Sequence, residues 1–161
     1  EEVSRGLGDV YKRQNKCGVS ISDIKKMTIW GNHSPTMYPD LDNAEINSKS
    51  VSSLIDDNNW IEEKFLKIVQ QRGKAIIDAR GASSATSAAN AAIDTVKATL
   101  TETPKDDWFS AALMSDGSYN VPEGLIFGFP LRVNAAGEVS IVQNLQISRY
   151  AQEKIDITRG E

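Results

Sequence analysis

The chain has 161 residues, of which 40% are hydrophobic and 25% are charged, and its formal net charge is −4. These values are ordinary for one globular domain, and two full domains would be a tight fit. The acidic balance without a basic stripe excludes a nucleic-acid partner, no apolar run is long enough to span a bilayer, and the single cysteine, Cys17, excludes an intramolecular disulfide and favours a reducing, intracellular setting.

The first part of the chain reads differently from the rest. Residues 1–14 show no helical or strand periodicity, so we interpret them as a non-native tail. Ser20 and Asp23 have the spacing of a capping box and predict a short helical turn. Residues 27–30 are β-branched and aromatic and predict a buried strand, which ends in a polar loop at 31–35. A second short strand is expected at 44–47.

Two long helices follow in the pattern. Residues 58–79 place apolar side chains at spacings of three and four, and Arg80-Gly81 closes the helix. Gly73 interrupts this pattern and is expected to kink or split the helix. The apolar face is expected to contain Trp60, Ile61, Phe65, Ile68 and Val69.

The second helix is expected from about Ser83 to Leu100 and is rich in alanine. So many small side chains allow another backbone to approach closely. Composition alone favours tight packing against the protein's own sheet. The alternative is a face for a second domain or a bound ligand.

The sequence pattern of the C-terminal part predicts mainly β-strands. Strands are expected at 108–113, 125–133 and 139–142, and a helix at 147–157 reaches the end of the chain without a stop signal. Its apolar face is expected to contain Tyr150, Ala151, Lys154 and Ile155. The order of one strand, two long helices, three strands and a helix predicts an α+β domain rather than a nucleotide-binding βαβ domain.

Few residues are candidates for chemistry. His33 is the only histidine and follows a buried strand, so it could carry a proton near neutral pH, although position alone favours an ordinary loop histidine. One histidine and one cysteine cannot build a metal cluster, so no metal site is expected. Asp40 and Asp42 suit turns, and Asp56-Asp57 suit a helix N-terminus. Ser83 and Ser84 suit helix capping, with a place beside a cofactor as the alternative.

A longer sequence motif around His33 bears on the interpretation of these candidate residues. Residues 29–40, with the sequence IWGNHSPTMYPD, resemble the active-site signature of malate dehydrogenases of the cytosolic and bacterial dimeric type. The resemblance continues in order through QRGKAII at 71–77, ARGASSA at 79–85, SAANAA at 87–92 and VPEG at 121–124. It covers residues 15–161, and it implies the C-terminal catalytic domain of the lactate/malate dehydrogenase superfamily, truncated at both ends and without its N-terminal Rossmann domain.

The resemblance implies specific roles. The family interconverts malate and oxaloacetate by hydride transfer with a nicotinamide cofactor, NAD here, with NADP left open. The matching histidine, His33, accepts and returns the substrate's hydroxyl proton. Ser83 and Ser84 match positions on the nicotinamide side of the pocket. The resemblance also implies a homodimer in the full-length protein and a cytoplasmic location, with an organellar one left open.

The remaining site residues of the family have no match in this chain. The aspartate that orients the histidine, and the arginine that grips the substrate carboxylate three residues later, lie upstream of the matching part. Asp9 and Arg13 do not fit their spacing, and neither is assigned. The chain alone is therefore expected to be inactive. The alternatives are another 2-hydroxyacid dehydrogenase of the lactate type and a non-catalytic assembly or binding module.

Overall fold

The computed structural model describes residues 19–20, 23–83 and 85–161. The proposed tail at 1–14, with Asp9 and Arg13, and also Cys17 and Ser84 lie outside the described residues. The elements follow one another in this order: β1 (Ile24–Lys25), β2 (Thr28–Trp30), β3 (Tyr38–Asp40), β4 (Glu45–Ile46), β5 (Lys49–Ser50), α2 (Val51–Ile55), α3 (Asn58–Trp60), η2 (Ile61–Phe65), α4 (Leu66–Arg80), α5 (Ala85–Thr99), β6 (Phe109–Met114), η3 (Ser118–Asn120), β7 (Ile126–Val133), β8 (Val139–Ile141) and α6 (Arg149–Arg159).

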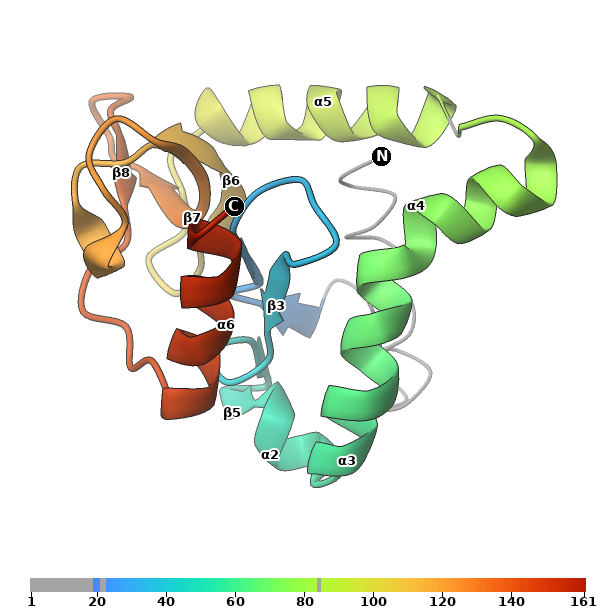
Figure 1. Ribbon diagram of the computed structural model, residues 1–161. Coiled ribbons are helices and arrows are strands. Elements are labelled where there is room, and N and C mark those ends of the chain that lie inside the picture. Colours follow the sequence, from blue (N-terminus) through green and yellow to red (C-terminus); the bar gives the residue numbers. More distant parts are fainter. Residues whose placement is uncertain (1–18, 21–22, 84) are drawn as a thin grey trace.

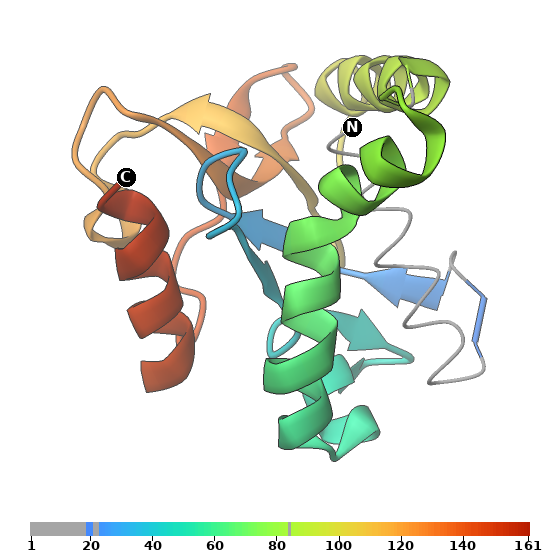
Figure 2. The same ribbon diagram turned by 45° about the vertical axis from the view of Figure 1, so that its right-hand side comes forward.

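Within the described residues, three small antiparallel sheets form the β part of the domain. They are β1-β4-β5, the β2-β3 hairpin and β6-β7-β8. The hairpin is joined to the third sheet by an isolated bridge between Gly31 and Gly128. Helices α4 and α6 stand on either side of β3, and α5 lies above, between the end of α4 and the third sheet (Figures 1 and 2). This mixture of segregated helices and antiparallel sheets confirms the α+β class.

The hydrophobic core lies where the hairpin, β7 and the helices meet. Trp30 is fully buried and packs edge-on against Tyr119 and Phe129, with ring centroids 4.8 and 6.2 Å away. Buried Phe65 and Val69 from the long helix and Ala151 and Ile155 from α6 belong to the same cluster. The core therefore packs around the strand that leads into the His33 loop.

The expected helix at 58–79 forms, but with a π-helical turn, η2, between α3 and α4. The Leu66 N–H donates to the Ile61 carbonyl, five residues back. The extra residue rotates the following side chains about the axis, so Leu66 is buried and Ile68 is 41% exposed. Placing Ile68 on the buried face was therefore wrong. Gly73 does not split the helix, which continues through it to Arg80.

The ends of several helices follow simple capping chemistry. The Asp23 carboxylate accepts the Ser20 N–H at 3.1 Å, as a capping box requires. Asp57 caps α3 by accepting the Trp60 N–H at 2.9 Å. The Ser148 hydroxyl accepts the Ala151 N–H at the start of α6. At the other end of α6 the Gly160 N–H donates to carbonyls of the last turn, and Gly160 itself stays in the right-handed region without a left-handed cap, so the expected lack of a stop signal is not contradicted.

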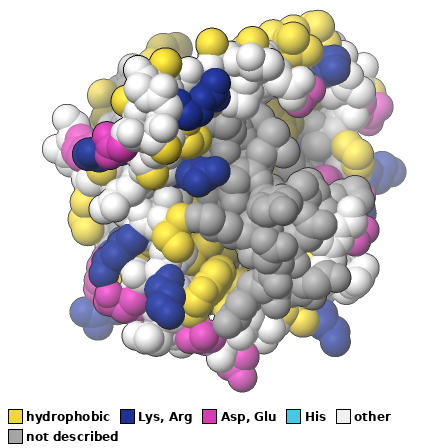
Figure 3. All heavy atoms as spheres, turned by 90° about the vertical axis from the view of Figure 1, so that its right-hand side faces the viewer, with side chains coloured by type: hydrophobic (Ala, Val, Ile, Leu, Met, Phe, Trp, Pro, Cys, Tyr) yellow, Lys and Arg dark blue, Asp and Glu magenta, His cyan; other side chains and the backbone are white. Residues whose placement is uncertain are grey.

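The alanine-rich helix α5 packs less tightly than its composition suggested. Of its residues only Ala91 is buried, so tight packing of the alanines against the sheet was wrong. Ile93, Val96 and Leu100 are 54, 55 and 80% exposed. Hydrophobic side chains are visible along the upper edge of the molecule, at the height of α5 (Figure 3).

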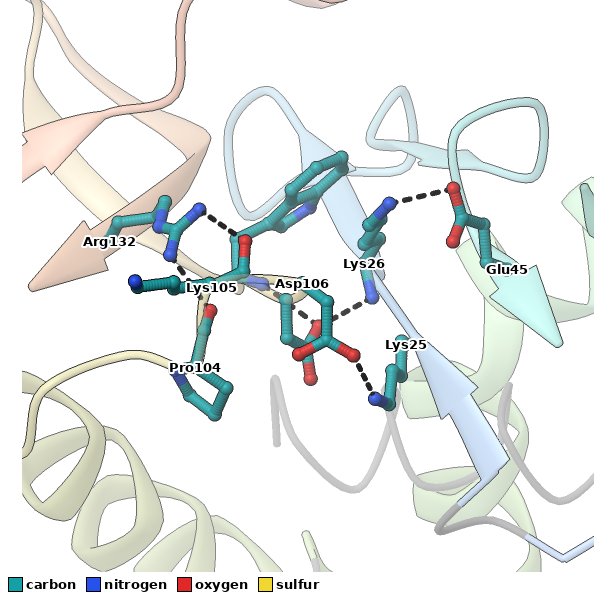
Figure 4. Close-up of polar contacts among 9 residues, drawn as sticks. Lys25, Lys26, Glu45, Pro104, Lys105, Asp106 and Arg132 are labelled. Carbon is teal, nitrogen blue, oxygen red and sulfur yellow. Dashed lines mark hydrogen bonds and ion pairs between the residues drawn. The ribbon is translucent and has the colours of Figure 1, made fainter. Parts of the chain in front are cut away.

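A group of charged residues ties the first sheet to the third one (Figure 4). Arg132 on β7 donates to the carbonyl oxygens of Pro104 and Lys105, at 2.8 and 2.9 Å. Lys25 on β1 pairs with Asp106 and holds the pKa of that carboxyl below its usual range. These contacts fix the segment before β6.

Within the described residues, no helix combines the length and apolar character needed to cross a membrane.

Candidate active site

His33 lies on the loop of a β-hairpin. Strands β2 and β3 pair antiparallel, with Trp30 opposite Tyr38, and residues 31–37 form the connecting loop. Inside this loop the Ser34 N–H donates to the Asn32 carbonyl at 2.8 Å, and the hydroxyls of Ser34 and Thr36 lie 2.8 Å apart. Short-range hydrogen bonds therefore shape the loop, while the His33 side chain is exposed.

The base of the hairpin is closed by a buried carboxylate. Asp40 accepts the Trp30 indole N–H at 3.1 Å and the Asn43 side-chain amide at 2.8 Å. It also accepts the backbone N–H groups of Asp42 and Asn43, at 2.9 and 3.1 Å. The interpretation of Asp40 as a turn residue is confirmed. Four donors on one side chain that is 0% exposed show that Asp40 has a structural task here.

Replacing Asp40 with asparagine is expected to lower the free energy of unfolding by about 2–4 kcal/mol. The introduced NH₂ group would face donors from Trp30 and Asn43, which leaves buried donors without an acceptor. Urea denaturation measures the loss. The control is Asp56→Asn, at an exposed carboxylate, where a change under about 0.5 kcal/mol is expected. Equal losses in the two variants would contradict this role.

A cavity of 620 Å³ opens beside His33. Its volume lies in the range typical of small-molecule sites. One wall is formed by Ala88, Ala91 and Ala92 of α5, and the opposite wall by Ser110 and Gly128 of the third sheet, with the remaining lining from Ile29, His33, Thr95, Val96, Ala111 and Ala112. The alanines of α5 thus border a hollow that contains the only histidine of the chain.

The chemistry on the cavity wall centres on the imidazole. Among the described residues, no hydrogen bond reaches the His33 ring, and no group of three or more His, Cys, Asp or Glu side chains is placed to hold a metal ion. The Ser110 hydroxyl is engaged with the backbone of Ile29, accepting its N–H at 2.9 Å. Burial raises the pKa of Tyr38, at the end of the loop, so its phenol stays neutral. Among the residues that line the cavity, His33 is therefore the one whose side chain can accept and release a proton.

Of the two serines expected at the site, the structure describes only Ser83. Ser83 is exposed before α5 and is not among the residues lining the cavity. Ser84 lies outside the described residues. A place beside the cofactor therefore stays a prediction for both serines.

Sequence reasoning missed the residues behind the loop. Gly128 lies so close to β2 that a Cβ there would be 2.6 Å from the Ile29 carbonyl oxygen. A glycine inside a strand pattern is a known sign of close backbone approach and could have suggested this contact. Thr158, on α6, touches Asn32, and no feature of the sequence indicates that contact.

The chain is similar to a family model and to solved structures of lactate and malate dehydrogenases. Residues 12–161 match the family model of the lactate/malate dehydrogenase alpha/beta C-terminal domain. The crystal structure of malate dehydrogenase from Naegleria fowleri is 36% identical, with a TM-score of 0.86 over 97% of this chain and 47% of that one. Lactate dehydrogenase from Trichomonas vaginalis, in complex with NADH and oxamate, is 28% identical, with a TM-score of 0.89 over 97% and 49%.

More distant structures share the fold. Malate dehydrogenase from Plasmodium falciparum, in complex with NADH, is 22% identical with a TM-score of 0.78 over 99% of this chain and 51% of that one. The chain spans about half the length of the solved structures it matches. Because the family model covers nearly all of the described residues, the chain belongs to the lactate/malate dehydrogenase family and carries its C-terminal domain.

Proposed function

We propose that the full-length protein carrying this chain is an NAD-dependent malate dehydrogenase, in which His33 accepts and returns the proton of the substrate hydroxyl. The observation that supports this most directly is the imidazole on the wall of the 620 Å³ cavity. The residues around it carry the IWGNHSPTMYPD signature, and a malate dehydrogenase is 36% identical over 97% of the chain.

The lining fits a flat cofactor ring. Ala88, Ala91, Ala92 and Gly128 contribute little volume and leave space between α5 and the third sheet. When bound, a nicotinamide cofactor supplies the hydride acceptor for oxidation of the carbon that bears the hydroxyl. The alanines of α5 and the backbone at Gly128 would hold the ring and exclude water. NAD is preferred because the Trichomonas and Plasmodium structures contain NADH, and the choice between NAD and NADP is tested in the same assay.

In this proposal His33 transfers the proton. In oxidation the substrate O–H bond breaks, the proton goes to the neutral His33 imidazole, and the oxygen keeps the electron pair that becomes part of the carbonyl. In reduction the imidazolium returns the proton to that oxygen. The exposed position of His33 on the cavity wall lets a substrate approach within hydrogen-bond distance of the ring.

The test is a substrate comparison on the purified full-length protein. We expect kcat/KM for malate to exceed that for lactate by at least about 100-fold, because a second substrate carboxylate offers charge-assisted bonds that lactate lacks. We expect no turnover from the 161-residue chain alone, because the resemblance implies that the substrate arginines lie upstream of the matching part. The second candidate function is a lactate-type dehydrogenase, which the Trichomonas structure favours with its TM-score of 0.89. A preference for lactate in this assay would support it.

We also propose that the full-length protein is a homodimer. Ile93 and Leu100 on α5 are exposed apolar side chains outside the cavity lining, and they support a contact with a second copy on that helix. Light scattering on the protein purified for the substrate comparison gives its mass. A monomeric mass at the concentration of the assay would contradict the proposal.

A further inference from the structure

The residue next to His33 is held from behind by the last turn of α6. The Asn32 N–H donates to the Thr158 hydroxyl at 3.1 Å, and the Asn32 side-chain amide donates to the Thr158 carbonyl at 3.1 Å. Carbonyls in the last turn of a helix lack intrahelical partners, so the second bond also satisfies the end of α6. Thr158 is 0% exposed. Two bonds therefore connect one buried threonine to the backbone and side chain of a single loop residue.

The same threonine fits against Gly31 without free space. A Cβ built on Gly31 would lie 2.2 Å from the Thr158 hydroxyl oxygen and 2.4 Å from its methyl carbon. Gly31 has a φ of 106°, a region that side chains disfavour. On the other side, the Gly128 N–H donates to the Gly31 carbonyl at 2.8 Å. Gly31 is thus confined between α6 and β7, directly before Asn32 and His33.

The far end of the loop has its own anchor on a third element. The Gln70 side-chain amide, on α4, donates to the Met37 carbonyl at 2.9 Å. Between these anchors the His33 side chain reaches the cavity, while Thr158 is absent from the residues that line it. Thr158 can therefore influence the imidazole only through the loop, and it has no contact with a ligand in the cavity.

We propose that Thr158 is a positioning residue for His33, which sets the direction of the imidazole by fixing Asn32 and Gly31 from behind. This inference rests on the proposed function, because the reaction is what gives the position of the ring a measurable consequence. A general base must lie within hydrogen-bond distance of the proton it removes, and a misplacement of about 1 Å can cost about 100-fold in rate. A loosened Asn32 would therefore lower kcat more than it raises KM.

The test compares three threonine variants in the full-length protein. Thr158→Val keeps the shape and removes the acceptor for the Asn32 N–H, and Thr158→Ser keeps the acceptor. Thr103→Val is the matched control, since the buried Thr103 hydroxyl accepts the Val133 N–H at 2.9 Å at the distant end of β7. We expect Thr158→Val to lower kcat by about 10- to 100-fold with KM within about twofold, and Thr158→Ser to restore most of the loss. Thr103→Val should leave kcat within about twofold.

Hydrogen exchange supplies a readout that needs no activity. Peptides covering residues 31–37 should exchange faster in Thr158→Val than in the wild type, with no such change in Thr103→Val. If Thr158→Val fails to fold, Asn32→Ala breaks the bond to the Thr158 carbonyl and should lower kcat in the same pattern. Unchanged exchange, unchanged kcat, or an equal kcat loss in Thr103→Val would each overturn the proposal. A wild-type protein without turnover would contradict the proposed function instead, and exchange would still decide whether Thr158 holds the loop.

Discussion

Replacing His33 with asparagine in the full-length protein is expected to lower kcat for malate oxidation by about 100- to 10,000-fold, the range that a positioned acid–base group contributes. Asparagine can accept a hydrogen bond from the substrate hydroxyl, but it cannot carry the proton away. The side chain is exposed, so the substitution should leave the core around Trp30 intact. The measurement is nicotinamide absorbance under substrate saturation. Near-normal turnover of malate in the His33→Asn variant would show that another group carries the proton.

The matched control for this experiment lies at a remote exposed turn. Asn134 accepts the N–H groups of Ala136 and Glu138, both at 2.9 Å, in the loop between β7 and β8. Asn134→Ala removes a polar side chain that is exposed on a loop, as His33 is, and should leave kcat within about twofold. The comparison separates loss of the proton carrier from general effects of altering a polar loop.

The sequence could predict the elements whose own residues determine them. Strand β7, helix α6 and the helical run from α3 through η2 to α4 each have six or more residues with a clear apolar period, and all were expected within a few positions. Strands β1, β3 and β5 and helix α2 were missed. These strands have two or three residues, too few for a period, and they form by pairing with partners such as Ile46 opposite Ile24. Such pairing depends on the folded arrangement and leaves no local signal.

The residues of the candidate site also differ in whether the sequence alone could identify them. His33 was identifiable because its residue type and its signature are local properties of the chain. The wall that α5 contributes was only one of two readings of an alanine-rich helix, because small side chains suit both tight packing and a cavity. The contact between Asn32 and Thr158 joins residues 126 positions apart. Nothing in either residue type specifies the other, so only the three-dimensional structure reveals it.

The close approach of Gly31 to Thr158 leads to the largest stability effect we expect. Gly31→Ala should lower the free energy of unfolding by about 3 kcal/mol or more, because it adds backbone strain to a steric overlap. The matched control is Gly137→Ala, at a φ of 82° with no atom within 4 Å of the added Cβ, where strain acts alone. A loss of about 1 kcal/mol is expected there. Urea denaturation of both variants, with unchanged m-values, measures the difference.

A double variant identifies the overlapping partner. Thr158→Ala removes the hydroxyl and methyl groups that would lie 2.2 and 2.4 Å from the new Cβ, and only the Thr158 Cβ remains, at 2.8 Å. The Gly31→Ala/Thr158→Ala protein should therefore be less destabilised than the sum of the single variants, by about 1 kcal/mol or more. Strictly additive losses would mean that Gly31 is required for its backbone conformation alone. A loss in Gly31→Ala no larger than that in Gly137→Ala would remove the steric argument altogether.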